Sequence, residues 1–109
     1  MKNEINKVKI VVFVPEDHAD AVRKAVGDAG SGKIGNYSHC SFSSKGKGRF
    51  LPLEGANPSI GNVGTSETVE EERIEFVCEK ENIEKVISVM KKAHPYEEVA
   101  YDVYPLLDL

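Results

Sequence analysis

The alternation of apolar and polar residues divides the chain into candidate strands and helices. Residues 8–14, VKIVVFV, carry β-branched and aromatic side chains on both parities, as expected for a central strand that is covered on both faces. Pro15 follows at a position that tolerates proline at the start of a helix, and apolar residues then recur at helical spacing from Val22 to Ala29. We expect a first strand, followed directly by a helix that ends at Gly30.

The next two strands are predicted from shorter patterns. Over residues 36–44, neighbouring side chains such as His39 and Cys40 would point to opposite faces of a strand. Over residues 70–79, apolar side chains alternate with glutamates, which is the pattern of a half-buried strand. Residues 43–68 are rich in glycine and proline, so we expect a long excursion from the sheet there, such as a hairpin arm.

A second helix and a last strand complete the pattern. Asn82 can cap the helix, apolar residues recur at helical spacing from Ile83 to Met90, and Pro95 prevents its continuation. A strand is predicted over residues 99–104. The complete order is strand, helix, strand, strand, helix, strand.

This order is that of the α+β, ferredoxin-like βαββαβ fold, and it predicts a four-stranded antiparallel sheet with strand order 4-1-3-2. We expect residues 1–109 to form a single domain. In this topology the link between the second and third strands, the Pro15 turn and the loop that begins at His94 lie at one end of the sheet. His39 belongs to the opposite end, so a site that unites His39 with His94 needs two chains.

Composition places the chain among soluble globular domains. It has 109 residues, of which 40% are hydrophobic and 29% charged, and no apolar run approaches the roughly 20 residues of a membrane-spanning helix. The apolar stretch near the N-terminus reads as a strand and lacks the small-residue cleavage site of a signal peptide. Two cysteines are too few for a disulfide scaffold, and free thiols in a reducing compartment are the simplest account. We therefore expect a cytoplasmic protein that does not associate with membranes.

Charge is distributed unevenly along the chain. The net charge is −4, with +4 over residues 1–53 and −8 over residues 54–109. An acidic chain is a poor candidate for nucleic-acid binding, because that binding depends on neutralising phosphates. The asymmetry suits subunits that meet head to tail, and a solvated acidic face is the alternative explanation.

Three basic residues, Lys45, Lys47 and Arg49, alternate with glycines in the segment KGKGR. Cationic side chains and backbone amides in such a segment could surround an anion, such as a nucleotide phosphate or a carboxylate. The alternative is a flexible loop whose charges are solvated. The first interpretation makes these residues candidates for binding a small anionic metabolite.

One imidazole and two carboxylates, from His94, Glu97 and Glu98, surround a proline-restricted turn. These groups could hold a divalent metal, or act as a base and its partner. In the structural alternative, His94 caps the carbonyl groups of the second helix and Tyr96 packs inward. A divalent cation is the one cofactor that this pattern suggests.

His39 and Cys40 are adjacent, so on a strand they would point to opposite faces. We expect Cys40 in the core and His39 at the surface or at an interface, where it could join a metal site only with a second chain. No constellation of residues specifies a reaction, and no catalytic residue is assigned. The sequence therefore favours a protein that binds and assembles over an enzyme.

Four segments together resemble one family: GNYSHCSF at residues 35–42, GRFLPLEGANP at residues 48–58, IGNVG at residues 60–64 and HPYEEVAYDVYPL at residues 94–106. They resemble the YqfO proteins of the Nif-three-like group, and in particular the inserted domain of the longer members, which is similar to PII signalling proteins and CutA. The resemblance covers essentially the whole chain. The metal ligands of the resembled proteins lie in flanking parts that this sequence does not contain, so the resemblance implies neither a metal ligand nor GTP cyclohydrolase activity here.

The resemblance implies a homo-oligomer, with a trimer favoured, because PII and CutA relatives form trimers by sheet packing. It also implies a small-effector site near the long link between the second and third strands. The leading expectation is therefore a non-catalytic ligand-binding or regulatory oligomer. The alternatives are a divalent-metal-binding CutA-like protein, an enzyme that uses His39, Cys40 or His94 with Glu97 across an interface, and a pure assembly domain.

Overall fold

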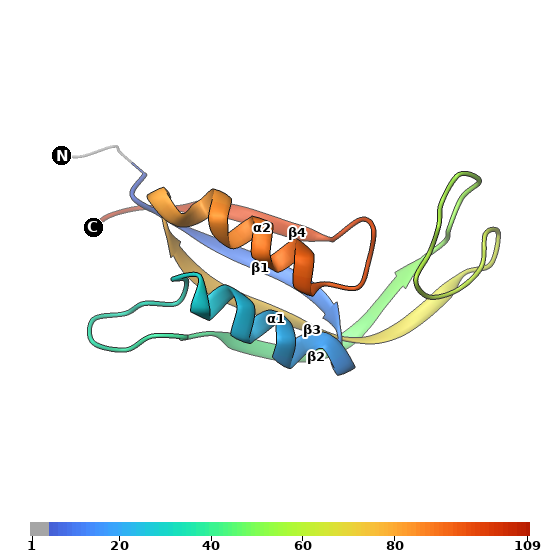
Figure 1. The fold of residues 1–109 in the computed structure, drawn as a ribbon, viewed down its shortest axis with the longest axis horizontal. Helices are drawn as coiled ribbons and strands as arrows, with labels where there is room; N and C mark the ends of the chain where they lie inside the picture. Colours follow the sequence, from blue (N-terminus) through green and yellow to red (C-terminus); the bar gives the residue numbers. More distant parts are fainter. Residues whose placement is uncertain (1–4) are drawn as a thin grey trace.

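Two helices cover one face of a four-stranded antiparallel sheet in the computed structural model, which describes residues 5–109 (Figure 1). The strands are β1 (Lys7–Pro15), β2 (Phe42–Phe50), β3 (Glu67–Glu79) and β4 (Tyr101–Leu106), and the helices are α1 (Glu16–Asp28) and α2 (Ile83–Ala93). A short 3-10 helix, Lys80–Asn82, leads into α2. These elements follow the βαββαβ order that the sequence predicts.

The sheet has the strand order β2-β3-β1-β4, and every neighbouring pair is antiparallel. This order confirms the predicted fold class. β1 pairs with β3 on one side and with β4 on the other, so its backbone groups are paired across two ladders. The central position explains the continuous apolar run of β1, in which Ile10, Val11 and Val12 are completely buried.

The hydrophobic core lies between the sheet and the two helices. Alternate side chains of β1 and β3, such as Val12 and Ile74, point to the helices because successive residues of a strand face opposite sides. Val22 of α1 and Met90 of α2 pack against them, and complete burial of such a side chain contributes about 1.5–3 kcal/mol. α2 ends before Pro95, as a proline at that place requires.

β2 differs from the predicted second strand, because it covers Phe42–Phe50 instead of residues 36–44. The residues before it follow no extended course, since Gly32 and His39 have positive φ angles. Cys40 consequently lies half-buried on a connecting loop, and the expectation that it belongs to the core is wrong. Side chains alternate in character over residues 36–44, but most of this segment does not form a strand.

β2 and β3 continue past the end of β1 as a two-stranded arm, which Figure 1 shows extending away from the helices. β1 ends opposite Glu71, and the residues of β3 before Glu71 pair with β2 alone. Residues 51–66, the arm tip, connect the two strands. Leu51 and Leu53 are 50% and 70% exposed, so the arm tip carries apolar surface into solvent in the single chain.

The other strand boundaries shift by a few residues. β3 begins at Glu67 instead of residue 70, because its first residues gain ladder partners in β2. β4 covers Tyr101–Leu106 instead of residues 99–104, in register with β1. Within residues 5–109, no helix is long and apolar enough to cross a membrane.

Candidate ligand-binding site

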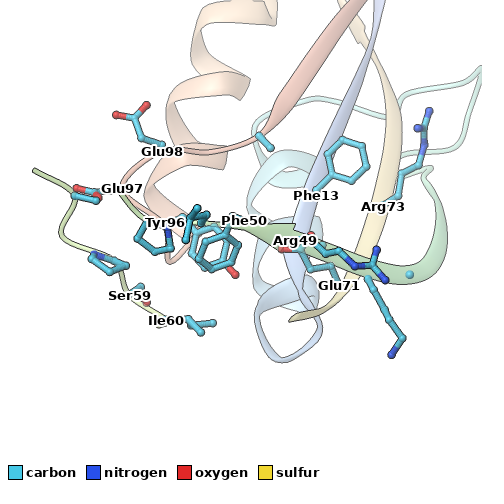
Figure 2. Close-up of a pocket in the computed structure, with 18 of the residues that line it drawn as sticks. Phe13, Arg49, Phe50, Ser59, Ile60, Glu71, Arg73, Tyr96, Glu97 and Glu98 are labelled. Atoms are coloured by element: carbon cyan, nitrogen blue, oxygen red, sulfur yellow. The ribbon is translucent and has the colours of Figure 1, made fainter. Parts of the chain in front are cut away.

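A cavity of about 800 Å³ lies at the base of the arm (Figure 2). Its walls come from the end of β1, the strands of the arm, the arm tip and the loop of residues 94–100. This volume is in the range of about 300–1,000 Å³ that is typical of small-molecule sites. The apolar part of the wall consists of Phe13, Phe50, Leu51, Pro52, Leu53, Ala56, Pro58, Ile60 and Ala100.

Two contacts join the arm to the loop of residues 94–100. The backbone amide of Asn57 donates a hydrogen bond to Oε2 of Glu97 at 2.8 Å. The ring of Phe50 meets the ring of Tyr96 edge to face, with centroids 5.8 Å apart and an interplanar angle of 64°. Because these contacts link segments that are distant in the sequence, the cavity exists only in the folded chain.

His94 anchors this loop to the end of β1. Its buried imidazole donates through Nε2 to the carbonyl oxygen of Phe13 at 2.7 Å, and Nδ1 accepts the backbone amide of Tyr96 at 3.1 Å. Both ring nitrogens are engaged, as in the neutral tautomer with its proton on Nε2. Burial lowers the pKa of His94 and outweighs the hydrogen bond to Phe13, which acts in the opposite direction. The imidazole thus reaches β1 rather than the carbonyl groups of α2.

Glu71 and Tyr96 place two polar groups in the wall of the cavity. Glu71 is only 8% exposed, and its carboxyl group lies over Gly48, where a Cβ atom would collide with it. Burial raises the pKa of Glu71 above its ordinary value. Burial and the nearby Glu71 carboxylate raise the pKa of Tyr96 to about 12.

The hydroxyl of Tyr96 is itself buried and has no hydrogen-bond partner of ordinary geometry among residues 5–109. It is close enough to Glu71 for each group to affect the pKa of the other. An unsatisfied buried hydroxyl is costly, and it is usually found where a ligand, an ion or a water completes the bonding.

The three basic residues of the KGKGR segment lie in the regular strand β2, so the expected flexible loop is absent at this place. Lys45 forms an ion pair with Glu16 at 3.8 Å, and Lys47 pairs with Glu70. Arg49 lines the cavity without an ion-pair partner in the described part of the chain. Two of the three cations are therefore already neutralised by neighbouring glutamates.

Arg73 contributes a cation to the same wall, but it also forms an ion pair with a neighbouring glutamate. Its Nε donates to Oε2 of Glu75 at 3.1 Å, and its guanidinium carbon lies 5.7 Å from the centre of the Phe13 ring. Figure 2 shows Arg73 and Phe13 on the side of the cavity away from Tyr96. Among residues 5–109, the charged groups of the wall that form no ion pair are therefore Arg49, Glu71, Glu98 and Glu97, and Glu97 accepts the hydrogen bond from the Asn57 amide.

His39 lies on the loop between α1 and β2, at the end of the molecule opposite the arm, as the topology predicts (Figure 1). Its Nε2 is 2.9 Å from Oδ1 of Asp28, and its Nδ1 is 2.9 Å from the hydroxyl of Ser38. The ring packs against Gly27, where any side chain would collide with it. His39 is exposed and fastens this loop to the end of α1.

Residues 5–109 contain no group of three histidine, cysteine, aspartate or glutamate side chains arranged to hold a metal ion. His94 lies behind the wall of the cavity with both ring nitrogens bonded. The remaining candidates from the sequence come together around the cavity: Lys45, Lys47, Arg49, Glu97 and Glu98.

No pattern in the sequence indicates that Glu71 belongs to a site. Glu71 has the parity of Glu75, opposite to that of the core residue Ile74, and this parity predicts exposure to solvent. Its burial comes from the arm and from the absence of a side chain at Gly48, and no local pattern encodes either. Tyr96 was expected to pack inward, but its unsatisfied hydroxyl could not be foreseen.

The arrangement of the elements defines the class of protein. The periplasmic divalent cation tolerance protein CutA from Archaeoglobus fulgidus superposes with a TM-score of 0.65 at 18% identity, over 92% of this chain and 83% of that protein. GlnK from Bacillus subtilis superposes with a TM-score of 0.62 at 16% identity, over 93% of this chain and 85% of that protein. At these identities the likeness concerns the fold alone, which is the ferredoxin-like fold of CutA and GlnK.

Sequence comparison identifies nearer relatives. The chain is 57% identical over 98 residues to the GTP cyclohydrolase 1 type 2 homolog of Halalkalibacterium halodurans and 55% identical over 98 residues to that of Bacillus subtilis. A Bacillus cereus protein related to NIF3 superposes with a TM-score of 0.83 at 55% identity, over 98% of this chain and 27% of that protein. The chain is therefore homologous to one segment of the longer proteins of the NIF3/YqfO family.

The chain matches only part of each of these relatives. The alignments cover 90% of this chain but 26% of each of the two curated relatives, so the chain spans about a quarter of their length. No family model matches the chain. The comparisons thus establish the fold and the homology to one segment of these relatives, and they do not extend to the activity of the whole relatives.

Proposed function

We propose that this protein is a non-catalytic module that binds a small ligand and has a regulatory role, and that it works as a homo-oligomer in the cytoplasm. The observation that carries this proposal is the cavity of about 800 Å³ at the base of the arm. It combines a largely apolar wall with a few polar groups, which is the usual composition of a small-molecule site. The arm and the loop of residues 94–100 would sense the ligand, because both line the cavity and a hydrogen bond joins them.

Exposed apolar side chains support the oligomeric part of the proposal. Leu51, Leu53 and Val63 of the arm tip are 50%, 70% and 49% exposed in the single chain. Burial of apolar surface contributes about 25 cal/mol per Å², so contact between chains would stabilise an arm of this kind. A trimer is the favoured assembly, from the resemblance to PII and CutA proteins.

Two other interpretations have less support from the geometry. An anionic ligand would depend mainly on Arg49, because Lys45 and Lys47 are paired with glutamates. A divalent metal held by His94, Glu97 and Glu98 would require the His94 ring to give up a buried hydrogen bond. The GTP cyclohydrolase activity in the name of the longer relatives is not part of the proposal.

A thermal-shift screen against a metabolite library tests the proposal. A ligand at about 100 times its dissociation constant should stabilise the protein by about 2.7 kcal/mol, which raises the melting temperature by several degrees. Ala56→Phe should abolish the shift by filling the cavity, whereas Ala21→Phe, on the exposed side of α1, should retain it. The proposal fails if no compound in the library shifts the melting temperature.

Light scattering of the purified protein tests the assembly separately. A trimer should have three times the 12.0 kDa mass of the chain. A mass equal to that of one chain at micromolar concentration would contradict the oligomeric part and leave the binding part to the screen.

A further inference from the structure

The chemical class of the ligand can be inferred from the polar groups of the cavity, an inference that rests on the proposed function. Glu71 is the most buried of these groups, at 8% exposure. Its carboxyl group lines the cavity and lies over Gly48, so it is held in the wall by the arm. In residues 5–109 no lysine, arginine or histidine forms an ion pair with it.

The cations nearby do not offset this carboxylate, because most of them have other partners. Lys47 pairs with Glu70, and Arg73 pairs with Glu75 while covering the ring of Phe13. Arg49 is exposed, so its charge is screened by solvent. A buried carboxylate without a cation is unfavourable, and a positively charged ligand would remove that penalty.

The hydroxyl of Tyr96 supplies a second acceptor beside Glu71. It is buried beside the carboxyl group of Glu71, and its oxygen accepts no hydrogen bond of ordinary geometry from a described residue. A primary ammonium group has three donors, so it can donate to a carboxylate and to a phenol oxygen at the same time. The two side chains together match one ammonium group.

The apolar residues of the wall indicate the character of the rest of the ligand. Aromatic rings from Phe13, Phe50 and Tyr96 line the cavity beside aliphatic side chains of the arm tip. Aromatic faces attract cations and pack against apolar groups. A ligand that fits this wall has an apolar body of moderate size.

We propose that the cavity binds an apolar primary amine, whose ammonium group donates to the carboxylate of Glu71 and to the hydroxyl of Tyr96. The apolar body packs against Phe13, Phe50 and the arm tip. An apolar amino acid belongs to this class, with its carboxylate directed to the exposed Arg49. An anion of the same shape is excluded by repulsion from Glu71, and a neutral alcohol leaves the carboxylate without a cation.

Three probes that share one body test the assignment: phenethylamine, phenethyl alcohol and 3-phenylpropionate. Calorimetric titration of the full chain should give a dissociation constant for the amine that is lower by roughly tenfold or more than those of the other two. Glu71→Gln should weaken amine binding by a similar factor, since Gln keeps the shape and removes the charge. Tyr96→Phe should weaken it by a smaller factor.

Glu54→Gln is the matched control, because Glu54 lies exposed in the arm tip and is not among the residues that line the cavity. It should change the dissociation constant of the amine by less than about twofold, as expected for a screened surface charge. Equal or tighter binding of the alcohol or of 3-phenylpropionate would overturn the amine assignment, and so would undiminished binding to Glu71→Gln. In those cases the library screen still decides the proposed function, so failure of the two proposals is distinguishable.

Discussion

Both faces of β3 are partly buried, but burial stabilises the fold on one face and costs stability on the other. Towards the helices, Ile74, Phe76 and Cys78 lie among apolar neighbours, and burial raises the pKa of the Cys78 thiol to about 11, which keeps it protonated. On the opposite face, Glu71 is buried at the base of the arm without an ion-pair partner in the described chain. The first face stabilises the fold, whereas the second retains a polar group at a cost in stability, as functional sites often do.

Ile74→Ala should give the largest effect on the helix-covered face, because this side chain is fully buried. We expect a loss of about 2–5 kcal/mol in the free energy of unfolding, measured by urea denaturation. Leu53→Ala, in the exposed arm tip, should cost less than about 0.5 kcal/mol in protein dilute enough to be monomeric. A loss of similar size for both variants would contradict the contrast between core and arm.

His94→Gln should cause the second-largest loss of stability, because His94 joins the helix-covered body to the wall of the cavity. Loss of the buried hydrogen bonds to Phe13 and Tyr96 should cost about 1–3 kcal/mol in the free energy of unfolding. His18→Gln, at a partly exposed position that leaves these contacts in place, should have little effect.

The pH dependence of stability gives His94→Gln a second readout. Because the folded chain lowers the pKa of His94 from 6.5, this group stabilises the fold above pH 6.5, and the stabilisation is lost as the pH falls through the lower folded value. The wild-type protein should therefore lose stability below pH 6.5 more steeply than the variant. Parallel curves in this range would show that the ring titrates freely.

Glu71→Gln should stabilise the protein at neutral pH, in contrast to the two changes above. The pKa of Glu71 is raised from 4.5, so the fold favours the protonated form and loses stability as the pH rises through the folded pKa. Urea midpoints should be higher for the variant at pH 7 and should converge with those of the wild type below pH 4.5. A variant that is less stable at pH 7 would mean that the carboxylate has a partner in the folded protein.

Glu97→Ala should have the smallest effect on global stability, within about 0.5 kcal/mol, because its side chain is exposed. It removes the hydrogen bond from the Asn57 amide, so amide hydrogen exchange in the arm tip should become faster. Glu98→Ala lacks such a bond and serves as the control. Unchanged protection of Asn57 in Glu97→Ala would show that the arm tip is held by other contacts.

Local patterns predicted the body of the fold well and the arm less well. The apolar run of β1, the parity of Ile74 in β3 and the stop at Pro95 are each encoded by neighbouring residues. β2 was misplaced because its KGKGR segment has no apolar alternation. It is a strand through its ladder with β3, where Lys47 faces Glu70.

The sequence by itself determined the order of the elements, the strand order that follows from it, and the clustering of the arm with the loop of residues 94–100 at one end of the sheet. These properties depend on side-chain periodicity and on chain connectivity, and both follow directly from the order of residues. Only the tertiary structure decided that Glu71 is buried, that both nitrogens of His94 are engaged, and that Lys45 is paired. Those outcomes depend on contacts at the base of the arm between segments that are distant in the sequence, and no local sequence pattern predicts such contacts.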